Sequence, residues 1–356
     1  MGERLTERVL EHLRVLVGAD TTNPPRRIGP DHPALRHAQE RLEASGFRVE
    51  VRDLGDGCVN LHARRGRPSV LINCHLDTVP ADGGWTGDPF DLKVKGDRAI
   101  GLGACDIKGA AACVLAACET GRGEAGVLLT TDEEAGASRC VRAFVEEGLG
   151  GYAGVIVSEP TGGRAVLEHR GIVSAEASFR GRGGHASMGV TRSALHDALR
   201  WGARAIEAAG EAEARGESWR LNIGRVEGGT KANMVASDAR VVFGVRPVAG
   251  VDADGVIKTI RAAAPAEADA TWTTRFSAPA LGESAESRAL AGRLGVEVGP
   301  GVDFWTEAAL FARAGIPTLV FGPGDIAQAH APGEFVRLGE LEHVARIYEQ
   351  LLGGEA

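Results

Sequence analysis

The chain has 356 residues and a formal net charge of −8 at pH 7, a balance that argues against nucleic acid or an anionic membrane surface as a partner. Hydrophobic residues make up 44% of the sequence, aromatic residues only 5%, and there are 50 glycines. This composition excludes a disordered or fibrous chain and indicates an aliphatic α/β core with many tight turns. The length exceeds the usual size of one domain, so we expect two domains.

The first residues predict an amphipathic helix over 5–16, with no positively charged stretch leading into an apolar segment. We therefore expect neither a secretory signal nor a membrane span, and a cytoplasmic location. The six cysteines are scattered through apolar surroundings without a Cys-x-x-Cys pair. We expect them to pack as small hydrophobic side chains.

Helices and apolar strands alternate along the first half of the chain. The predicted helices lie at 5–16 and 33–44, and the predicted strands at 49–51, 59–63, 70–74, 127–131 and 154–157. The pattern resumes late in the chain, with helices at 308–314 and 338–352 and a strand at 318–321. This alternation predicts a mainly parallel sheet covered by helices. We expect one α/β domain formed by residues 1–172 and 284–356.

The segment between these two parts has a different pattern. Strands are predicted at 173–179, 220–226, 240–247 and 271–276, with helices near 194–214 and 254–264. Strands and helices in this proportion, without the regular alternation of the first part, indicate an α+β module. We place this inserted domain at residues 173–283.

Residues 69–74 form a short apolar run that predicts a buried strand of a parallel sheet, and His75 and Asp77 follow at its end. Side chains repeat every second residue along a strand, so His75 and Asp77 point the same way. Asp77 can then accept the second ring N–H of a metal-bound His75 and fix its tautomer. Ordinary hydrogen bonds at a strand end are the alternative for this pair.

Two further segments place carboxylates at the ends of apolar runs. Asp106 lies near the start of a helix predicted at 108–118, where the helix N-terminus favours a negative charge. One carboxylate can bridge two metal ions that lie about 3.5–4 Å apart. Asp132-Glu133-Glu134 follows another apolar strand, and adjacent carboxylates repel unless a cation or a shared proton relieves them. A solvated run of charges is the alternative for this triplet, but the three segments together predict a zinc or cobalt site with nitrogen and oxygen ligands.

Five motifs follow one another in an order that resembles the two-metal aminoacylase and carboxypeptidase family. They are His75-x-Asp77, Gly101-x-Gly103-x-x-Asp106, Glu133-Glu134, Ser158-Glu159-Pro160-Thr161 and Gln328-Ala-His330. The resemblance extends over nearly the whole chain. It implies a zinc-exopeptidase-like catalytic domain with an inserted lid and dimerisation domain, and therefore a homodimer.

The resemblance also implies the roles of the metal ligands and of the carboxylate beside them. One ion is held by His75, Asp106 and Glu159, and a second by Asp106, Glu134 and His330. Glu133 then holds no metal and takes a proton from the attacking water. The expected cofactor is Zn²⁺ or Co²⁺, one or two ions per subunit, because a divalent metal makes water nucleophilic near neutral pH. No Gly-x-Ser-x-Gly motif offers a rival nucleophile.

Three residues of the inserted domain match positions at which family members contact substrate. His185 lies in a glycine-rich loop, and the resemblance implies that it reaches the active site of the partner subunit and helps to hold the developing oxyanion. Asn233 and Arg246 match substrate-binding positions, and Arg246 can offer a forked pair of donors to a substrate carboxylate. The alternatives are a surface histidine without function for His185 and a salt bridge at a strand end for Arg246.

Residues 303–308 and 322–334 resemble the branch of the family that deacetylates acetylornithine or acetylcitrulline. This resemblance implies removal of the Nα-acetyl group from one of these small molecules in arginine biosynthesis, and it leaves the choice between the two open. A succinyl-diaminopimelate desuccinylase, another aminoacylase or a metallopeptidase is the enzymatic alternative. An inactive metal-binding assembly protein is the non-enzymatic alternative, which loss of Glu133 or of a ligand would mark; none is lost.

Overall fold

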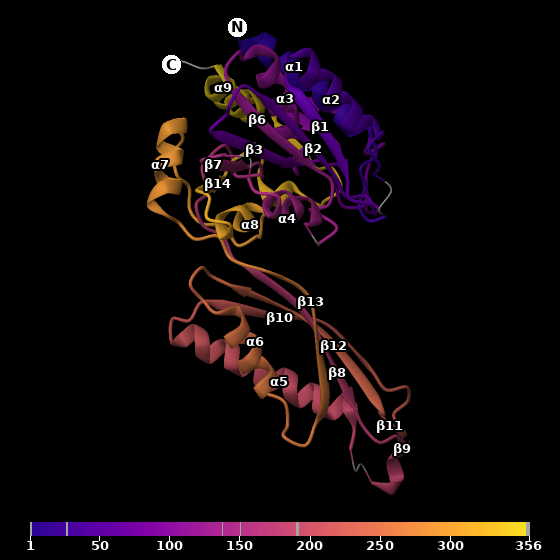
Figure 1. The fold of residues 1–356 in the computed structure, drawn as a ribbon. Helices are drawn as coiled ribbons and strands as arrows, with labels where there is room; N and C mark the ends of the chain where they lie inside the picture. The colour runs from indigo at the N-terminus through magenta and orange to yellow at the C-terminus, as the bar shows by residue number, and fades with distance from the viewer. Residues whose placement is uncertain (1, 26–27, 137, 150, 190–191, 354–356) are drawn as a thin grey trace. The chain divides into compact units, whose positions relative to one another are not determined.

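The computed structural model describes residues 2–25, 28–136, 138–149, 151–189 and 192–353. The chain forms two compact units. Unit 1 comprises Met1–Leu167, Glu283–Gly301 and Thr306–Ala356, and unit 2 comprises Glu168–Gly282 and Val302–Trp305. Both units are shown in Figure 1.

Unit 1 is built on a six-stranded sheet with the order β1-β2-β6-β3-β7-β14. Its strands are β1 (Arg48–Asp53), β2 (Val59–Arg65), β3 (Val70–His75), β6 (Ala125–Thr130), β7 (Gly154–Val157) and β14 (Thr318–Val320). The four strands from β6 to β14 are parallel, and β1 and β2 are antiparallel additions at one edge. Every residue of β6 and β7 is buried, as expected for parallel strands covered on both faces. The predicted mainly parallel α/β fold is confirmed.

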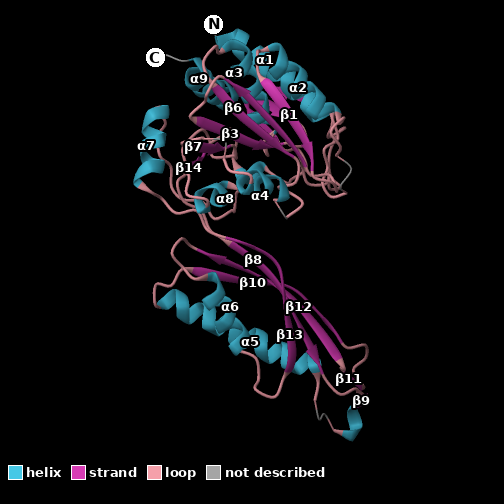
Figure 2. Ribbon diagram, viewed as in Figure 1, coloured by secondary structure: helices cyan, strands magenta, loops and turns pink. Residues whose placement is uncertain are grey.

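Helices cover both faces of this sheet (Figure 2). One layer contains α1 (Gly2–Gly18), α2 (Pro33–Ala44), α3 (Lys108–Thr120) and α9 (Leu338–Gly353), which pack on one another. The other side carries α4 (Arg139–Glu146), α7 (Ala285–Leu294) and α8 (Ala308–Arg313). Helix α3 is buried along its whole length except for its last two residues, because its side chains are nearly all small or apolar and neighbouring helices approach closely.

A small three-stranded sheet in unit 1 joins distant parts of the chain. It consists of β4 (Lys93–Lys95), β5 (Arg98–Ile100) and β15 (Phe335–Arg337), in the order β15-β5-β4. Strand β15 pairs antiparallel with β5, with Phe335 opposite Ile100. The residues just before β15 therefore lie beside the loop that follows β5.

Unit 2 is a four-stranded antiparallel sheet in the order β10-β12-β8-β13, with helices along one face (Figure 1). The strands are β8 (Ile172–Arg180), β10 (Trp219–Gly228), β12 (Asp238–Pro247) and β13 (Asp269–Ala278), and the helices are α5 (Ala194–Ala214) and α6 (Ala253–Ala262). Residues of β8 and β12 alternate between buried and partly exposed, as a sheet with one covered face requires. The buried ring of Trp201 on α5 lies 5.2 to 5.9 Å from the rings of Phe179, Phe243 and Trp272.

The segment Val302–Trp305 belongs to unit 2. The sequence pattern instead assigns it to the domain formed by residues 1–172 and 284–356. Asp303 contacts the guanidinium groups of Arg170 and Arg220, each at 2.7 Å. The indole N–H of Trp305 donates to the carbonyl of Pro279 at 3.1 Å. These contacts depend on tertiary structure and have no counterpart in a local sequence pattern.

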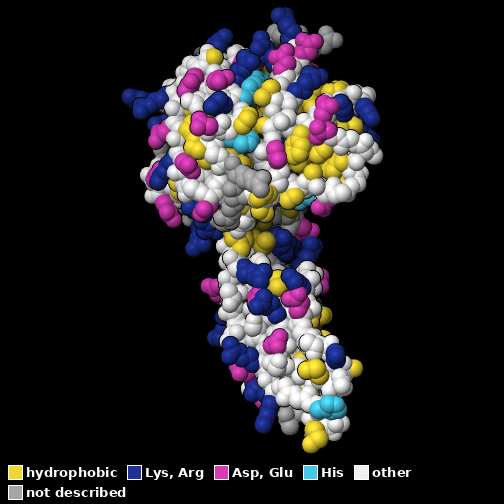
Figure 3. Space-filling model, turned by 90° about the vertical axis from the view of Figure 1, so that its right-hand side faces the viewer, with side chains coloured by type: hydrophobic (Ala, Val, Ile, Leu, Met, Phe, Trp, Pro, Cys, Tyr) yellow, Lys and Arg dark blue, Asp and Glu magenta, His cyan; other side chains and the backbone are white. Residues whose placement is uncertain are grey.

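Among the described residues, no helix combines the length and the apolar character that crossing a lipid bilayer requires. Acidic and basic side chains are interspersed over the face of the molecule drawn in Figure 3.

We predict that the aromatic cluster supports unit 2. Trp201→Ala should lower the free energy of unfolding of this unit by about 3–5 kcal/mol, the usual range for truncating a buried tryptophan. Trp201→Phe should lose less, because it keeps an aromatic ring and gives up mainly the indole N–H bond to the carbonyl of Ile260, at 2.8 Å. Denaturant unfolding followed by circular dichroism measures both variants, and equal losses would contradict the packing argument.

Candidate metal centre

The carboxyl ends of three parallel strands bring the candidate ligands of unit 1 to one edge of the sheet. His75 is the last residue of β3, Glu134 follows β6 by a few residues, and Glu159 follows β7. Parallel strands end side by side, so functional side chains gather at this edge. Asp106 approaches from the loop before α3, and His330 from the loop before β15.

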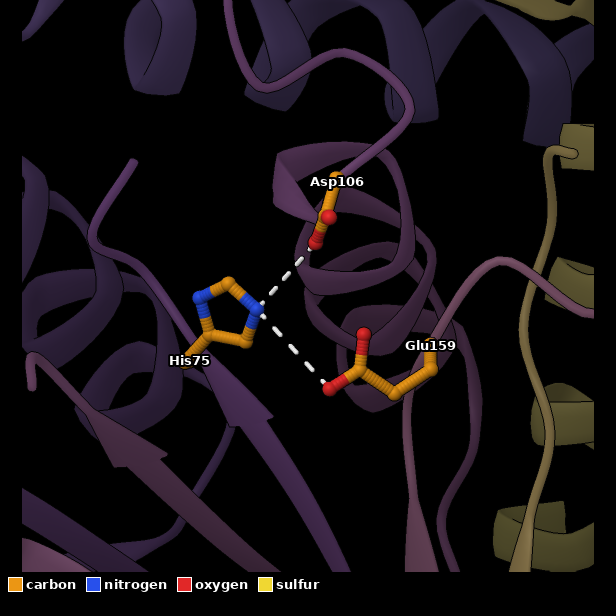
Figure 4. Close-up of side chains that lie close together, drawn as sticks. All are labelled: His75, Asp106 and Glu159. Atoms are coloured by element: carbon orange, nitrogen blue, oxygen red, sulfur yellow. Dashed lines mark ion pairs between the residues drawn. The ribbon is translucent and has the colours of Figure 1, made fainter. Parts of the chain in front are cut away.

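Two groups of ligand-type side chains meet at this edge and share one residue. In the first, Nε2 of His75 lies 3.3 Å from Oδ1 of Asp106 and 3.9 Å from Oε1 of Glu159 (Figure 4). In the second, Nε2 of His330 lies 3.3 Å from Oδ2 of Asp106 and 2.9 Å from Oε1 of Glu134. Asp106 therefore offers one carboxylate oxygen to each group.

These residues fit divalent metal ions. Oδ1 of Asp106 is buried and accepts no hydrogen bond within the described structure. Tetrahedral coordination at about 2.0–2.1 Å sets ligand atoms about 3.3 Å apart, close to the separations found here. One imidazole nitrogen and two carboxylate oxygens in each group suit zinc or cobalt.

The charges at the site favour a cation. Burial raises the pKa of Glu159 and Glu134, and nearby carboxylates add to this effect. Hydrogen bonds to Asp106 and Glu134 raise the pKa of His330 to about 11. Although burial opposes it, the nearby His330 and His75 hold the pKa of Asp106 below its usual range. The carboxylates that favour protonated histidines at this site also favour divalent cations bound between the carboxylates and the histidines.

Asp77 is buried and organises the neighbouring loop. Its carboxylate accepts the backbone N–H groups of Glu133 at 3.3 Å and Glu134 at 2.9 Å. Nδ1 of His75 lies 3.0 Å from the backbone carbonyl oxygen of Asp77 and 3.5 Å from Oδ1 of the Asp77 side chain. The carboxylate of Asp77 thus holds the backbone of the Glu133-Glu134 loop, and its bond to the ring of a metal-bound His75 stays a prediction.

Glu133 lies next to the ligand Glu134 but belongs to neither group of ligand-type side chains. It is half-buried, and no hydrogen bond to its carboxylate is found among the described residues. Burial raises the pKa of Glu133 well above its ordinary value. A carboxylate with a raised pKa and no fixed partner can accept and return a proton.

Three buried charged residues of unit 1 are not predicted by the sequence patterns. Glu334 is 2% exposed and accepts three backbone N–H groups of the Asp106 loop. Glu307 is 1% exposed, and burial raises its pKa to about 8. Lys108 is fully buried and donates to the carbonyl of Ala19 at 3.1 Å. In the sequence, each of the three is only a charged residue inside or beside an apolar run. Such residues are common in proteins, so this pattern alone does not identify a functional residue.

The three candidate residues of the inserted domain all belong to unit 2, whereas the five candidate ligands belong to unit 1. His185 is exposed in β9 (Gly184–His185), which pairs with β11 (Met234–Val235), and its Nδ1 lies 2.7 Å from the hydroxyl of Ser187. This pairing brings Asn233 beside the same loop, where its carbonyl accepts the N–H of the residue after His185 at 3.0 Å.

Arg246 lies on β12 and is partly buried. Burial lowers its pKa from the ordinary value for arginine. No ion pair or hydrogen bond of its guanidinium group is found within the described part of the chain. The salt bridge considered as the alternative for this residue is therefore not found there.

The geometry of a carboxylate shared by two ligand groups is that of a two-metal hydrolase. The chain belongs to peptidase family M20/M25/M40, whose family model matches residues 71–353. It is 46% identical to an N-acetyl-L-citrulline deacetylase of Xanthomonas campestris pv. campestris, with 97% of each chain covered. An acetylornithine deacetylase of Myxococcus xanthus is 33% identical, with 96% of this chain and 97% of that one covered.

A tripeptidase from Staphylococcus aureus shares the fold, with a TM-score of 0.78 over 98% of both chains at 20% sequence identity. The expected family and the expected enzyme class, a hydrolase, are confirmed by these comparisons.

The shared position of Asp106 predicts different losses of metal from different variants. Asp106→Ala should release both ions, because each group loses an oxygen ligand. His330→Ala should release mainly one ion, since His330 belongs to only one group. Metal content per subunit, measured by elemental analysis after dialysis, tests this expectation. Asp82→Ala removes an exposed carboxylate outside both groups and serves as the matched control; similar losses in Asp106→Ala and His330→Ala would argue against a bridge.

Proposed function

We propose that this chain is a metal-dependent deacetylase that removes the Nα-acetyl group from acetylcitrulline or acetylornithine, a step of arginine biosynthesis. The pair of ligand groups joined at Asp106 supports metal-dependent amide hydrolysis. The similarity to a named acetylcitrulline deacetylase over nearly the full length supports the acetylated amino acid as substrate. The lower identity to an acetylornithine deacetylase makes acetylornithine the second candidate.

The chemistry requires a water nucleophile, a polarised amide carbonyl and a proton for the leaving nitrogen. His75, Asp106 and Glu159 would hold one divalent ion, and Asp106, Glu134 and His330 a second. Such ions would supply the first two requirements, by lowering the pKa of a water to about 7 and by polarising the carbonyl oxygen. Glu133 takes a proton from the attacking water and later gives it to the nitrogen as the C–N bond breaks. Acetate and the free amino acid leave. Zn²⁺ or Co²⁺, one or two per subunit, is the cofactor in this proposal.

A panel of amides tests the proposal. Release of acetate or of free amine is measured with added zinc or cobalt on acetylcitrulline, acetylornithine, acetylmethionine, succinyl-diaminopimelate and a dipeptide. The highest kcat/KM is expected for acetylcitrulline or acetylornithine. Cleavage of the dipeptide alone would show a peptidase, and cleavage of the succinyl compound alone would show a desuccinylase. Metal binding without cleavage of any of the five would favour the assembly protein.

The role of Glu133 predicts a specific defect. Glu133→Gln should keep its metal content, because Glu133 lies outside both ligand groups. Its turnover should fall by about 10²-fold or more, the usual scale of general-base catalysis. Steady-state kinetics and elemental analysis of the same preparation measure the two properties. A variant that loses metal instead would show that the roles of Glu133 and Glu134 are exchanged.

Unit 1 is the catalytic domain in this proposal, and unit 2 is the lid and dimerisation domain of a cytoplasmic homodimer. His185 reaches the active site of the partner subunit and steadies the oxyanion, and Asn233 contacts substrate from the same loop region. Arg246 binds the substrate carboxylate. The exposure of His185 and the unpaired guanidinium of Arg246 within the described residues support these roles.

Mixing two inactive variants tests the role of His185. His185→Ala should lower kcat by about 10²–10³, the usual effect of losing one oxyanion donor, and should leave metal content intact. After subunit exchange with Glu133→Gln, mixed dimers pair an intact Glu133 with the intact His185 of the other chain at one of two sites. Activity should recover to about one quarter of wild type, since about half of the dimers are mixed.

Native mass spectrometry verifies that subunits have exchanged before activity is measured. Absence of recovery in verified mixed dimers would assign His185 to its own subunit or to no catalytic role.

A further inference from the structure

Glu334 connects the two loops that carry Asp106 and His330. It lies four residues after His330 and directly before β15, whose first residue pairs with the last residue of β5. The loop that ends at Asp106 begins directly after β5. The strand pairing therefore sets Glu334 against the Asp106 loop, although 228 residues separate Glu334 from Asp106 in sequence.

The carboxylate of Glu334 accepts three backbone N–H groups from this loop. Oε2 accepts from Gly103 at 3.0 Å, and Oε1 accepts from Cys105 and from Asp106, each at 2.9 Å. The backbone carbonyl of Glu334 also accepts the N–H of Gly101 at 3.1 Å. Glu334 is 2% exposed, so water competes little for these bonds. A carboxylate has several acceptor positions on its two oxygens, so one side chain can accept all three of these donors.

The segment 101–106 has a tightly constrained conformation that brings its amide groups toward Glu334. Gly103 has a φ of +77°, and a Cβ there would lie 2.6 Å from Cγ2 of Thr78. The carbonyl of Gly103 accepts the N–H of Lys108 at 2.7 Å, which joins the loop to the start of α3. The amide groups of the loop point at one carboxylate, and without it the buried donors would lack a partner.

We propose that Glu334 is a positioning residue that fixes the backbone of Asp106 and so aims its two carboxylate oxygens at both metal sites. The inference rests on the metal ligands of the proposed function. Because Asp106 belongs to both groups, misplacing it weakens both sites together. Residues that orient metal ligands typically change metal affinity by about 10–100-fold when they are replaced.

The competing interpretation is that Glu334 contributes only to overall stability. The two interpretations differ in what a substitution changes. A stability role predicts that any core variant with the same loss of stability weakens metal binding equally. A positioning role predicts a loss of metal affinity specific to Glu334, accompanied by a looser Asp106 loop.

Cobalt titration of the metal-free, full-length chain, followed by visible absorption, distinguishes these interpretations. Glu334→Ala should weaken Co²⁺ binding by about 10–100-fold at both sites. Glu334→Gln should have a smaller effect, because its amide keeps an oxygen acceptor but turns an NH₂ group toward at least one loop N–H. Leu13→Ala creates a cavity in a fully buried part of α1 and controls for stability, and Glu342→Gln repeats the substitution at a partly exposed residue of α9. Neither control should change Co²⁺ affinity.

Hydrogen exchange of the metal-free chain gives a second measurement that needs no ion. Amides of the segment 101–106 should exchange faster in both Glu334 variants and at the wild-type rate in both controls. Wild-type Co²⁺ affinity in Glu334→Ala, or a loss matched by Leu13→Ala, would overturn the inference. A wild-type chain that binds no Co²⁺ would instead refute the proposed ligands, so the two failures are distinguishable.

Discussion

The structure depends on carboxylates that are buried together at one edge of a parallel sheet. Strands β3, β6 and β7 run parallel and end side by side, so the acidic segments that follow them are forced into one place. The buried acids of unit 1 include Asp77, Asp106, Asp132, Glu159, Glu307 and Glu334. A buried carboxylate is unfavourable unless a proton, hydrogen-bond donors or a cation compensates it. Apart from Glu307, these acids meet this requirement in one of two ways.

Backbone amides satisfy one set of these acids. Asp77 accepts the N–H groups of the Glu133-Glu134 loop, Asp132 accepts the N–H groups of Arg139 and Cys140, and Glu334 accepts three from the Asp106 loop. Asp106, Glu159 and the partly buried Glu134 face histidine nitrogens instead. The acids that hold loops are thus distinct from the acids that are free to hold ions. Fixed loops keep the acids that face the histidines in place despite their mutual repulsion, which is the preorganisation that a metal site needs.

The sequence predicts the parallel sheet, and points to His75, Asp106 and the Glu133-Glu134 pair, because these signals are local, whereas Glu159 and His330 follow from the resemblance to the family. Apolar runs mark β3, β6 and β7, and each candidate ligand near them stands within a few residues of a strand end. Other features arise only when distant segments meet. Strands β5 and β15 have three residues each, too few for a periodic pattern, and their pairing is what places Glu334. The segment Val302–Trp305 joins unit 2 through Asp303 and Trp305, whose partners lie far away in sequence.

The candidate ligands come from five separate segments between His75 and His330, which links metal binding to folding. An unfolded chain does not hold these segments together, so the ions favour the native state by mass action. Before any ion binds, however, the repelling carboxylates must be held together by other parts of unit 1. Helix α3 is suited to this task, because it is almost wholly buried against α1 and α9 and Asp106 lies two residues before its first turn. The apolar side chains that pack α3 against α1 and α9 therefore support the acidic edge at which the chemistry is proposed to occur.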